Sequence, residues 1–177
     1  MRLKTTYYNN PVLNEERARD TLEFMKRQIR LPVLVMGEKK EFESYLEKYF
    51  SDKFNYTNHD LNWYSPSDTK YNTILCFEII EHLLNPLLFL SECKRLMRKN
   101  GLLYISYPTH TLKYFWHESH FHEYDKSRFI YLLKIAGLEV VSYLEKTMRS
   151  KKIGIRPLLK NTPIGWSKQQ YYKLRSI

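Results

Sequence analysis

Two groups of polar residues have the types and the spacing that chemistry requires. Glu81 and His82 are adjacent and follow the apolar run 73–77, and an imidazole at such a position is a candidate general base. The structural alternative is a turn in which Glu81 bonds backbone amides at a helix start and His82 packs beneath it. The second group contains three histidines and two glutamates, namely His117, Glu118, His120, His122 and Glu123.

The histidine-rich group raises the question of a metal. The spacing His120-x-His122 would place both imidazoles on one face of an extended segment, which is a workable arrangement of ligands. No Cys or Asp completes a ligand set, so we expect no metal here. His120 and His122 are instead candidates for an acceptor pocket, together with Tyr107 and His110 at the end of a predicted strand.

Positive charge is concentrated at one end of the chain. The formal net charge is +10, but nine cations follow Glu145 and no acid does, whereas the first 145 residues hold 20 cations and 19 acids. A uniformly basic nucleic-acid-binding protein would not show this distribution. The sequence therefore predicts a near-neutral domain with a basic C-terminal segment.

Length and composition limit the class of protein. At 177 residues, 43% of them hydrophobic, the chain can bury one sizeable core and is too apolar to be disordered. No apolar run approaches a membrane span, and the N-terminus lacks the apolar stretch of a signal peptide. Cys76 and Cys93 give no disulfide framework, which suits a reducing compartment. We expect a cytoplasmic protein without a membrane span.

The elements that must position these residues alternate along the chain. Helical patterns occupy 14–29, 41–50, 86–99 and 126–136, and strands are expected at 33–36, 54–61, 73–77, 102–107, 138–144 and 169–177. Asn85 and Asp125 are predicted N-caps, Gly101 and Gly137 are predicted left-handed C-terminal caps, and Pro108 is expected to end a strand. Alternation of buried strands with amphipathic helices predicts an α/β fold, a doubly wound and mostly parallel sheet with helices on both faces.

We expect a single domain over 1–177. It comprises an N-terminal helix within 1–30, an α/β core over 31–145, and a basic loop and final strand over 146–177. In such a sheet ligands bind outside the carboxyl ends of the strands.

Residues 71–141 carry a family resemblance because several short motifs occur in a fixed order. They are Glu81-His82-Leu83 after an apolar strand, Asn85-Pro86, Arg95-Leu96, Lys99-Asn100-Gly101, His122-Glu123-Tyr124, Asp125 and Ala136-Gly137. In this order they resemble the class I S-adenosylmethionine-dependent methyltransferases, which have a Rossmann-like fold, and the similarity extends over about 31–145. The resemblance implies S-adenosylmethionine as cofactor, with Gly37 beneath it, Asp60 on its ribose, Phe77 and Glu78 beside its methionine end, and His82 as a base.

The first part of the chain departs from the family pattern. The loop after the first strand reads Met36-Gly37-Glu38-Lys39-Lys40, and only Gly37 matches the several small residues usual there. Only 33 residues separate Gly37 from Tyr71, which predicts one strand–helix unit fewer than usual.

Three functions remain open from the sequence. The first is methyl transfer to an unidentified small-molecule or anionic acceptor, and the second is a catalytically degenerate binding or assembly module. The third is nucleic-acid binding through the basic C-terminal segment. A homo-oligomer in which a second chain covers the shortened sheet edge is also compatible with the sequence.

Overall fold

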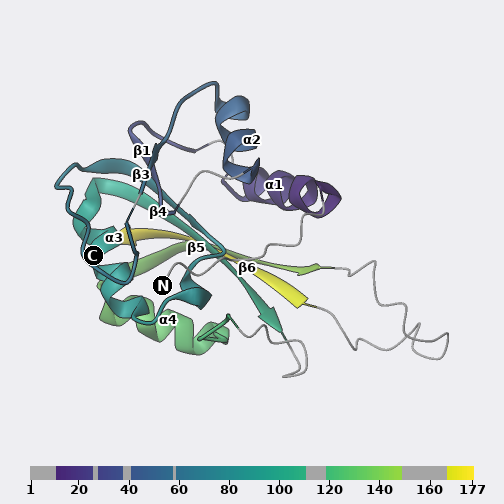
Figure 1. Ribbon diagram of the computed structural model, residues 1–177. Helices are drawn as coiled ribbons and strands as arrows, with labels where there is room; N and C mark the ends of the chain where they lie inside the picture. Colours follow the sequence, from purple (N-terminus) through teal and green to yellow (C-terminus); the bar gives the residue numbers. More distant parts are fainter. Residues whose placement is uncertain (1–10, 26–27, 38–40, 58, 111–118, 149–166) are drawn as a thin grey trace.

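A six-stranded sheet forms the centre of the computed structural model, which describes residues 11–25, 28–37, 41–57, 59–110, 119–148 and 167–177 (Figure 1). Its order is β2-β1-β3-β4-β6-β5. The strands are β1 (Val33–Val35), β2 (Asn55–Tyr56), β3 (Tyr71–Phe77), β4 (Met97–His110), β5 (Leu138–Met148) and β6 (Ser167–Ser176). The first four are parallel, and β6 runs antiparallel between β4 and β5.

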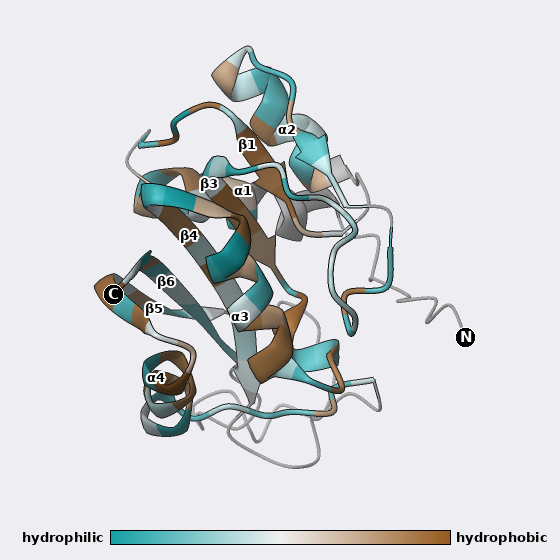
Figure 2. Ribbon diagram, turned by 90° about the vertical axis from the view of Figure 1, so that its left-hand side faces the viewer, coloured by the Kyte–Doolittle hydropathy of each residue, from teal (hydrophilic) through white to brown (hydrophobic). Residues whose placement is uncertain are grey.

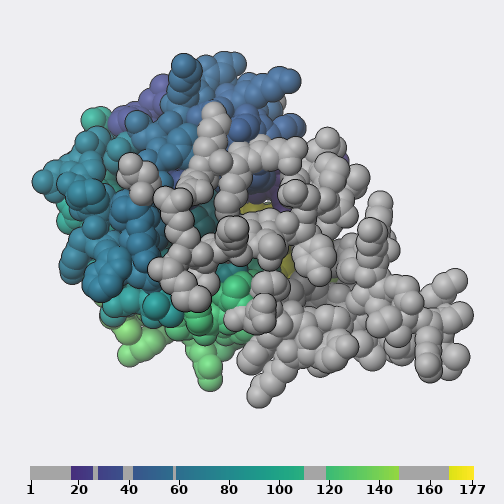
Figure 3. All heavy atoms as spheres, viewed as in Figure 1, coloured from purple at the N-terminus to yellow at the C-terminus, as the bar shows by residue number. Residues whose placement is uncertain are grey.

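Helices cover both faces of the sheet. Helices α1 (Pro11–Met25) and α2 (Glu41–Phe50) lie on one side, and α3 (Pro86–Leu96) and α4 (Lys126–Ile135) lie on the other (Figures 1 and 2). In the space-filling view α2 forms the upper surface and α4 the lower edge (Figure 3). This arrangement confirms the predicted α/β fold, a doubly wound and mostly parallel sheet.

The strands separate two hydrophobic clusters, as their two-residue side-chain period requires. In β3, Ile74 and Cys76 pack toward α3 and α4, whereas Leu75 and Phe77 pack toward α1 and α2. Figure 2 shows the matching concentration of apolar residues in β1 and β3. Burial raises the pKa of the Cys76 and Cys93 thiols well above the ordinary range, so both are structural rather than nucleophilic.

The predicted N-caps of the two later helices are confirmed. The Asn85 side chain accepts a hydrogen bond from the Leu88 amide at 3.1 Å, and Asp125 accepts one from the Arg128 amide at 2.9 Å. Each cap satisfies a backbone donor that the first helical turn leaves without a partner. Gly137, with a φ of 71°, follows α4 as predicted.

The region around β4 differs from the sequence prediction at both ends. The left-handed residue is Asn100, with a φ of 63°, and not Gly101; both lie within β4, because α3 ends at Leu96. The strand also continues through Pro108, which pairs in register with Gln169. Proline is tolerated because the pairing with β3 ends at Ser106, so Pro108 faces no β3 hydrogen bond.

The connection from β2 to β3 contains neither helix nor strand among its described residues, 57 and 59–70. It is fastened to α3 by polar contacts: the carboxylate of Glu92 accepts from the Ser65 amide at 2.9 Å, and Arg95 bridges Glu92 and Asp68, each at 2.6 Å. Asn62 accepts from the Leu84 amide at 2.7 Å. The chain therefore passes from the second strand to the third without a crossover helix, as the short spacing predicted.

The termini of the predicted elements shift by a few residues. Helix α1 begins at Pro11 and ends at Met25, earlier than expected, and β2 has two residues where eight were predicted. No helix in the described part of the chain is long and apolar enough to cross a membrane.

Ion pairs neutralise part of the positive charge of the basic C-terminal segment. Lys146 pairs with Asp20, Lys168 with Glu145 at 2.7 Å, and Arg175 with Glu139 at 2.7 Å. The cations from Arg149 to Lys160 lie outside the described residues.

Candidate functional site

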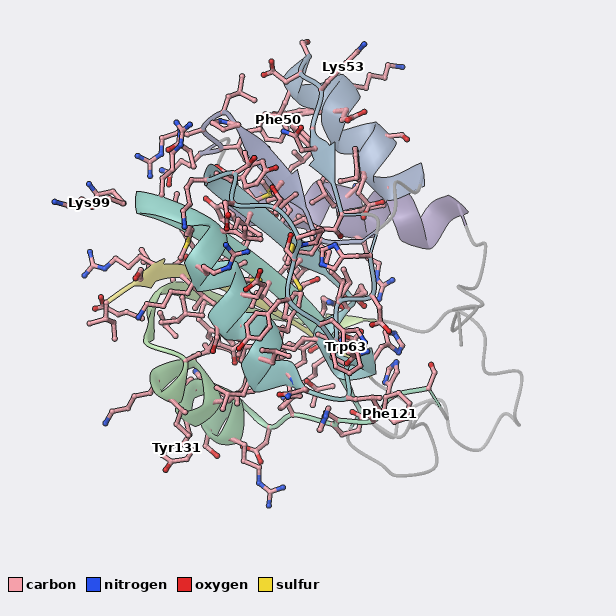
Figure 4. The ribbon with its side chains drawn as sticks, turned by 60° about the vertical axis from the view of Figure 1, so that its left-hand side comes forward. Phe50, Lys53, Trp63, Lys99, Phe121 and Tyr131 are labelled. Atoms are coloured by element: carbon pink, nitrogen blue, oxygen red, sulfur yellow. The ribbon has the colours of Figure 1, made fainter. Side chains whose placement is uncertain are left out.

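The carboxyl ends of the parallel strands meet at one edge of the sheet. The Gly37 amide, after β1, donates to Thr57 Oγ1, after β2, at 2.6 Å. The Glu78 amide, after β3, donates to the carbonyl of Ser106 in β4 at 2.9 Å. Figure 4 shows Trp63 and Phe121 toward the end of the molecule opposite Lys99, which lies near the start of β4. This edge is where a doubly wound sheet binds ligands.

Glu78 joins four elements at this edge. Its carboxylate accepts hydrogen bonds from Arg17 of α1 at 2.5 Å, from the Ser106 hydroxyl of β4 at 2.8 Å, and from the side-chain Nε2 of Gln169 in β6. Its φ is 55°, a left-handed conformation that costs a non-glycine residue energy. The side-chain contacts hold Glu78 in this conformation, directly after the central strand.

A second polar cluster follows within a few residues. Glu81 and His82 lie in the short 3-10 helix η1 (Ile80–His82), and the His120 ring lies 4.8 Å from the His82 ring between centroids. Burial, and next the charge of Glu78, raise the pKa of Glu81 well above the ordinary carboxyl value. His122 is held to this turn by its backbone amide, which donates to the Glu81 carbonyl at 3.2 Å.

Both histidines in this cluster have the same ring atom engaged. Nδ1 of His82 is 2.9 Å from the Ser119 carbonyl, and Nδ1 of His120 is 3.0 Å from Oε1 of Glu123. A carbonyl or carboxylate oxygen only accepts, so Nδ1 is the donor in each ring, and in the neutral form of the ring the lone pair is then on Nε2. The cluster therefore places two imidazole rings next to a buried carboxyl group.

The structure thus brings together Gly37, Glu78, His82 and His120 of the predicted site residues at one edge, with His122 beside them. It does not bring Tyr107 to a pocket. That side chain is fully buried against Phe129, with ring centroids 4.6 Å apart, and against Tyr172. A strand's side chains alternate between faces, and position 107 falls on the face that α4 covers, so Tyr107 is a core residue.

Three further predicted residues lie in other settings. Phe77 packs edge-on against Phe42 in the α1–α2 cluster. Asp60 is exposed and accepts from the backbone and side chain of Asn62, both at 2.9 Å, as a turn residue does. His110 ends β4, where its backbone pairs with Ser167.

Sequence reasoning missed two residues of this edge. Arg17 reaches Glu78 from α1, and an arginine among the several charged residues of a helix carries no signal of that contact. The resemblance calls for an acidic residue after the second strand, and the residue that directly follows β2 is Thr57, which is not acidic. The predicted strand extends to residue 61 and so has Asp60 near its end, whereas β2 ends at Tyr56.

Gly37 is the position at this edge where backbone conformation restricts the residue type most. Its φ of 103° lies outside the left-handed helical region that Asn tolerates, and an added Cβ would come within 3.3 Å of the Ile79 side chain. We expect Gly37→Asn to lower the free energy of unfolding by about 1–3 kcal/mol, measured by urea denaturation. Gly137→Asn is the matched control: its φ of 71° suits Asn, and the nearest atom is the flexible end of Lys94. An equal loss in both variants would contradict this explanation.

Comparison with known proteins gives a consistent result. The family model described as a methyltransferase domain matches residues 16–143. The ubiquinone biosynthesis O-methyltransferase of Glaesserella parasuis serovar 5 (strain SH0165) is 28% identical over 109 residues, which is 61% of this chain. The chain spans 38% of the length of that relative.

Solved structures share the fold at low sequence identity. A SAM-dependent methyltransferase from Archaeoglobus fulgidus superposes with a TM-score of 0.63 at 15% identity, covering 93% of this chain and 94% of that one. The N-methyltransferase NodS from Bradyrhizobium japonicum WM9, in complex with S-adenosyl-L-homocysteine, superposes with a TM-score of 0.64 at 11% identity. The match covers 95% of this chain and 89% of that one.

The family model matches residues 16–143, which is more than half of the chain. This protein belongs to the methyltransferase domain family.

Proposed function

We propose that this protein binds S-adenosylmethionine at the carboxyl edge of the sheet and directs methyl transfer to an acceptor held beside it. The Arg17–Glu78 pair carries the proposal. The amino-acid end of the cofactor has one ammonium and one carboxylate group, and this pair offers one charge of each sign at the end of the central strand. The NodS structure, with S-adenosyl-L-homocysteine bound, supports the same chemistry.

The remaining residues of the edge would shape the site. Gly37 has no side chain where the chain leaves β1, and Thr57 orients the amide of Gly37. Glu78 is pre-oriented by Ser106 and Gln169, so little conformational freedom is lost when a ligand binds. The assignments of Asp60 to the ribose and of Phe77 to the methionine end stay predictions, and Thr57 is nearer to the strand end than Asp60 is.

For methyl transfer, the main task of the protein is to align the acceptor with the methyl group. When bound, S-adenosylmethionine supplies a methyl group on a positively charged sulfur, already activated for displacement. The chain must hold the acceptor in line with that methyl group and exclude competing water. His82 presents Nε2 as the nitrogen that would accept a proton from the acceptor, since Nδ1 faces the Ser119 carbonyl. His110, His120 and His122 remain candidates for the acceptor side.

Calorimetric titration with S-adenosyl-L-homocysteine tests the proposal. We expect saturable heat with one ligand per chain, and a matched titration with adenosine should bind far more weakly because it lacks the amino-acid end. No heat from protein that unfolds cooperatively would contradict the proposal and would favour a binding or assembly module.

A further inference from the structure

We propose that Glu81, His82 and His120 form a binding site for a divalent transition-metal ion of the zinc type. One ligand atom from each residue lies within 4.8 Å of the others. Two imidazoles and one carboxylate are a donor set that suits zinc and its neighbours in the first transition row, whereas magnesium and calcium prefer oxygen ligands alone. From the sequence, His120-x-His122 is a possible pair of metal ligands, but no further ligand is found to complete the set. The fold completes the set with residues from η1, distant in the sequence.

The buried carboxyl group of Glu81 favours an ion at this place. Glu81 is only 1% exposed, and within the described part of the chain its Oε2 has no hydrogen-bond partner. A buried carboxyl oxygen without a partner is costly, and a positively charged ion would satisfy it. Three neighbouring buried atoms, His122 Nε2, Glu123 Oε2 and Tyr124 Oη, also lack partners among the described residues.

The orientation of the His82 and His120 rings also favours metal binding. Metal-binding histidines usually donate their other ring N–H to a carbonyl or carboxylate, which fixes the tautomer and the ring plane. His82 does so to the Ser119 carbonyl, and His120 does so to Glu123. In the neutral form each ring therefore has its lone pair on Nε2, and Nε2 of His82 is 3.8 Å from Oε1 of Glu81.

The geometry requires only a small contraction. With bonds of about 2.0–2.2 Å in tetrahedral geometry, ligand atoms lie roughly 3.3 Å apart. The largest separation within the trio therefore has to shorten by about 1.5 Å, which a change of side-chain rotamer can supply. Three protein ligands leave a fourth position open, as in catalytic rather than structural zinc sites.

The proposed metal site and the proposed base use the same atom, Nε2 of His82. In the metal-bound protein this nitrogen cannot take a proton, so the two roles exclude each other. Metal binding is measured without S-adenosylmethionine, and its outcome is therefore independent of the cofactor titration above.

The experiment titrates chelator-treated full-length protein with Zn²⁺ by calorimetry and with Co²⁺ by visible absorption. We expect one ion per chain, a Co²⁺ spectrum typical of four or five ligands, and no displacement by excess Mg²⁺. Glu81→Gln and His120→Asn each remove a ligand and should lower the affinity by more than the roughly 10–100-fold that the loss of an outer-shell partner costs. The controls are His59→Gln, outside the trio, and His122→Asn, beside it, and both should bind as the unaltered protein does.

Thermal unfolding without added ion shows which variants are folded. If Glu81→Gln does not fold, the affinity of His120→Asn still tests the proposal. Two results would overturn the proposal. One is the absence of ion binding by the unaltered protein. The other is binding that survives in Glu81→Gln but is lost in His122→Asn, which would place the ion on the His120-x-His122 pair.

Discussion

Replacing Phe129 with alanine is expected to lower the free energy of unfolding by about 3–5 kcal/mol. Phe129 is fully buried on the inner side of α4, with its ring centroid 4.6 Å from that of Tyr107 and 4.8 Å from that of Tyr172. Truncation removes the apolar surface and leaves a cavity among large aromatic rings that cannot close around it. Urea denaturation followed by fluorescence measures the loss.

Tyr131 provides the matched control. It lies two residues further along the same helix, is 66% exposed, and points outward in Figure 4. Tyr131→Ala removes a ring of similar size, yet we expect a change within about 0.5 kcal/mol. If the two variants lost similar stability, the burial of Phe129 against Tyr107 and Tyr172 would not explain the loss.

Replacing Glu78 is expected to have the largest effect on the proposed activity. The carboxylate makes charge-assisted contacts worth about 1.5–3 kcal/mol, so Glu78→Ala should weaken S-adenosyl-L-homocysteine binding roughly 10–100-fold. The variant also leaves Arg17, Ser106 and Gln169 without a shared acceptor, and its unfolding free energy should fall as well. Calorimetry measures the first effect and denaturation the second.

A second substitution separates the side chain from the backbone. Glu78→Gly removes the same carboxylate but relieves the left-handed φ of 55°, and it should be about 1 kcal/mol more stable than Glu78→Ala. Both variants should lose the same ligand affinity. Asp68→Ala, which breaks an exposed pair with Arg95, should leave affinity unchanged. If Glu78→Gly kept full affinity, the carboxylate would have no part in binding.

The fold was predictable from the sequence because its signals are local. Asn85-Pro86 and Asp125 set the helix starts, and wholly apolar runs such as 33–35 mark strands buried on both faces. The errors arose where tertiary context decides. Pro108 continues a strand because β3 has already ended, and a two-residue β2 follows from its place at the sheet edge.

The site was predictable only in part, for the same reason. Motif order pointed to Gly37, Glu78 and His82, which do meet at one edge. No sequence spacing could show that Arg17 of α1 reaches Glu78, or that Glu81 completes a cluster with His120. Tyr107 was misplaced because the side of a strand that faces a helix depends on packing, and aromatic residues suit a core and a pocket equally.

The antiparallel insertion of β6 has a consequence for how the protein folds. Strand β5 pairs with β6, and β6 pairs with β4, so residues 138–148 join the sheet only through residues 167–176. During synthesis on the ribosome, one edge of β4 therefore stays unpaired until β6 has been synthesised. Pairings between distant residues, such as Ser106 with Tyr171, slow folding because the intervening loop must close first. During that interval β4 has one unpaired edge and β5 has two, and unpaired strand edges favour misfolding and aggregation.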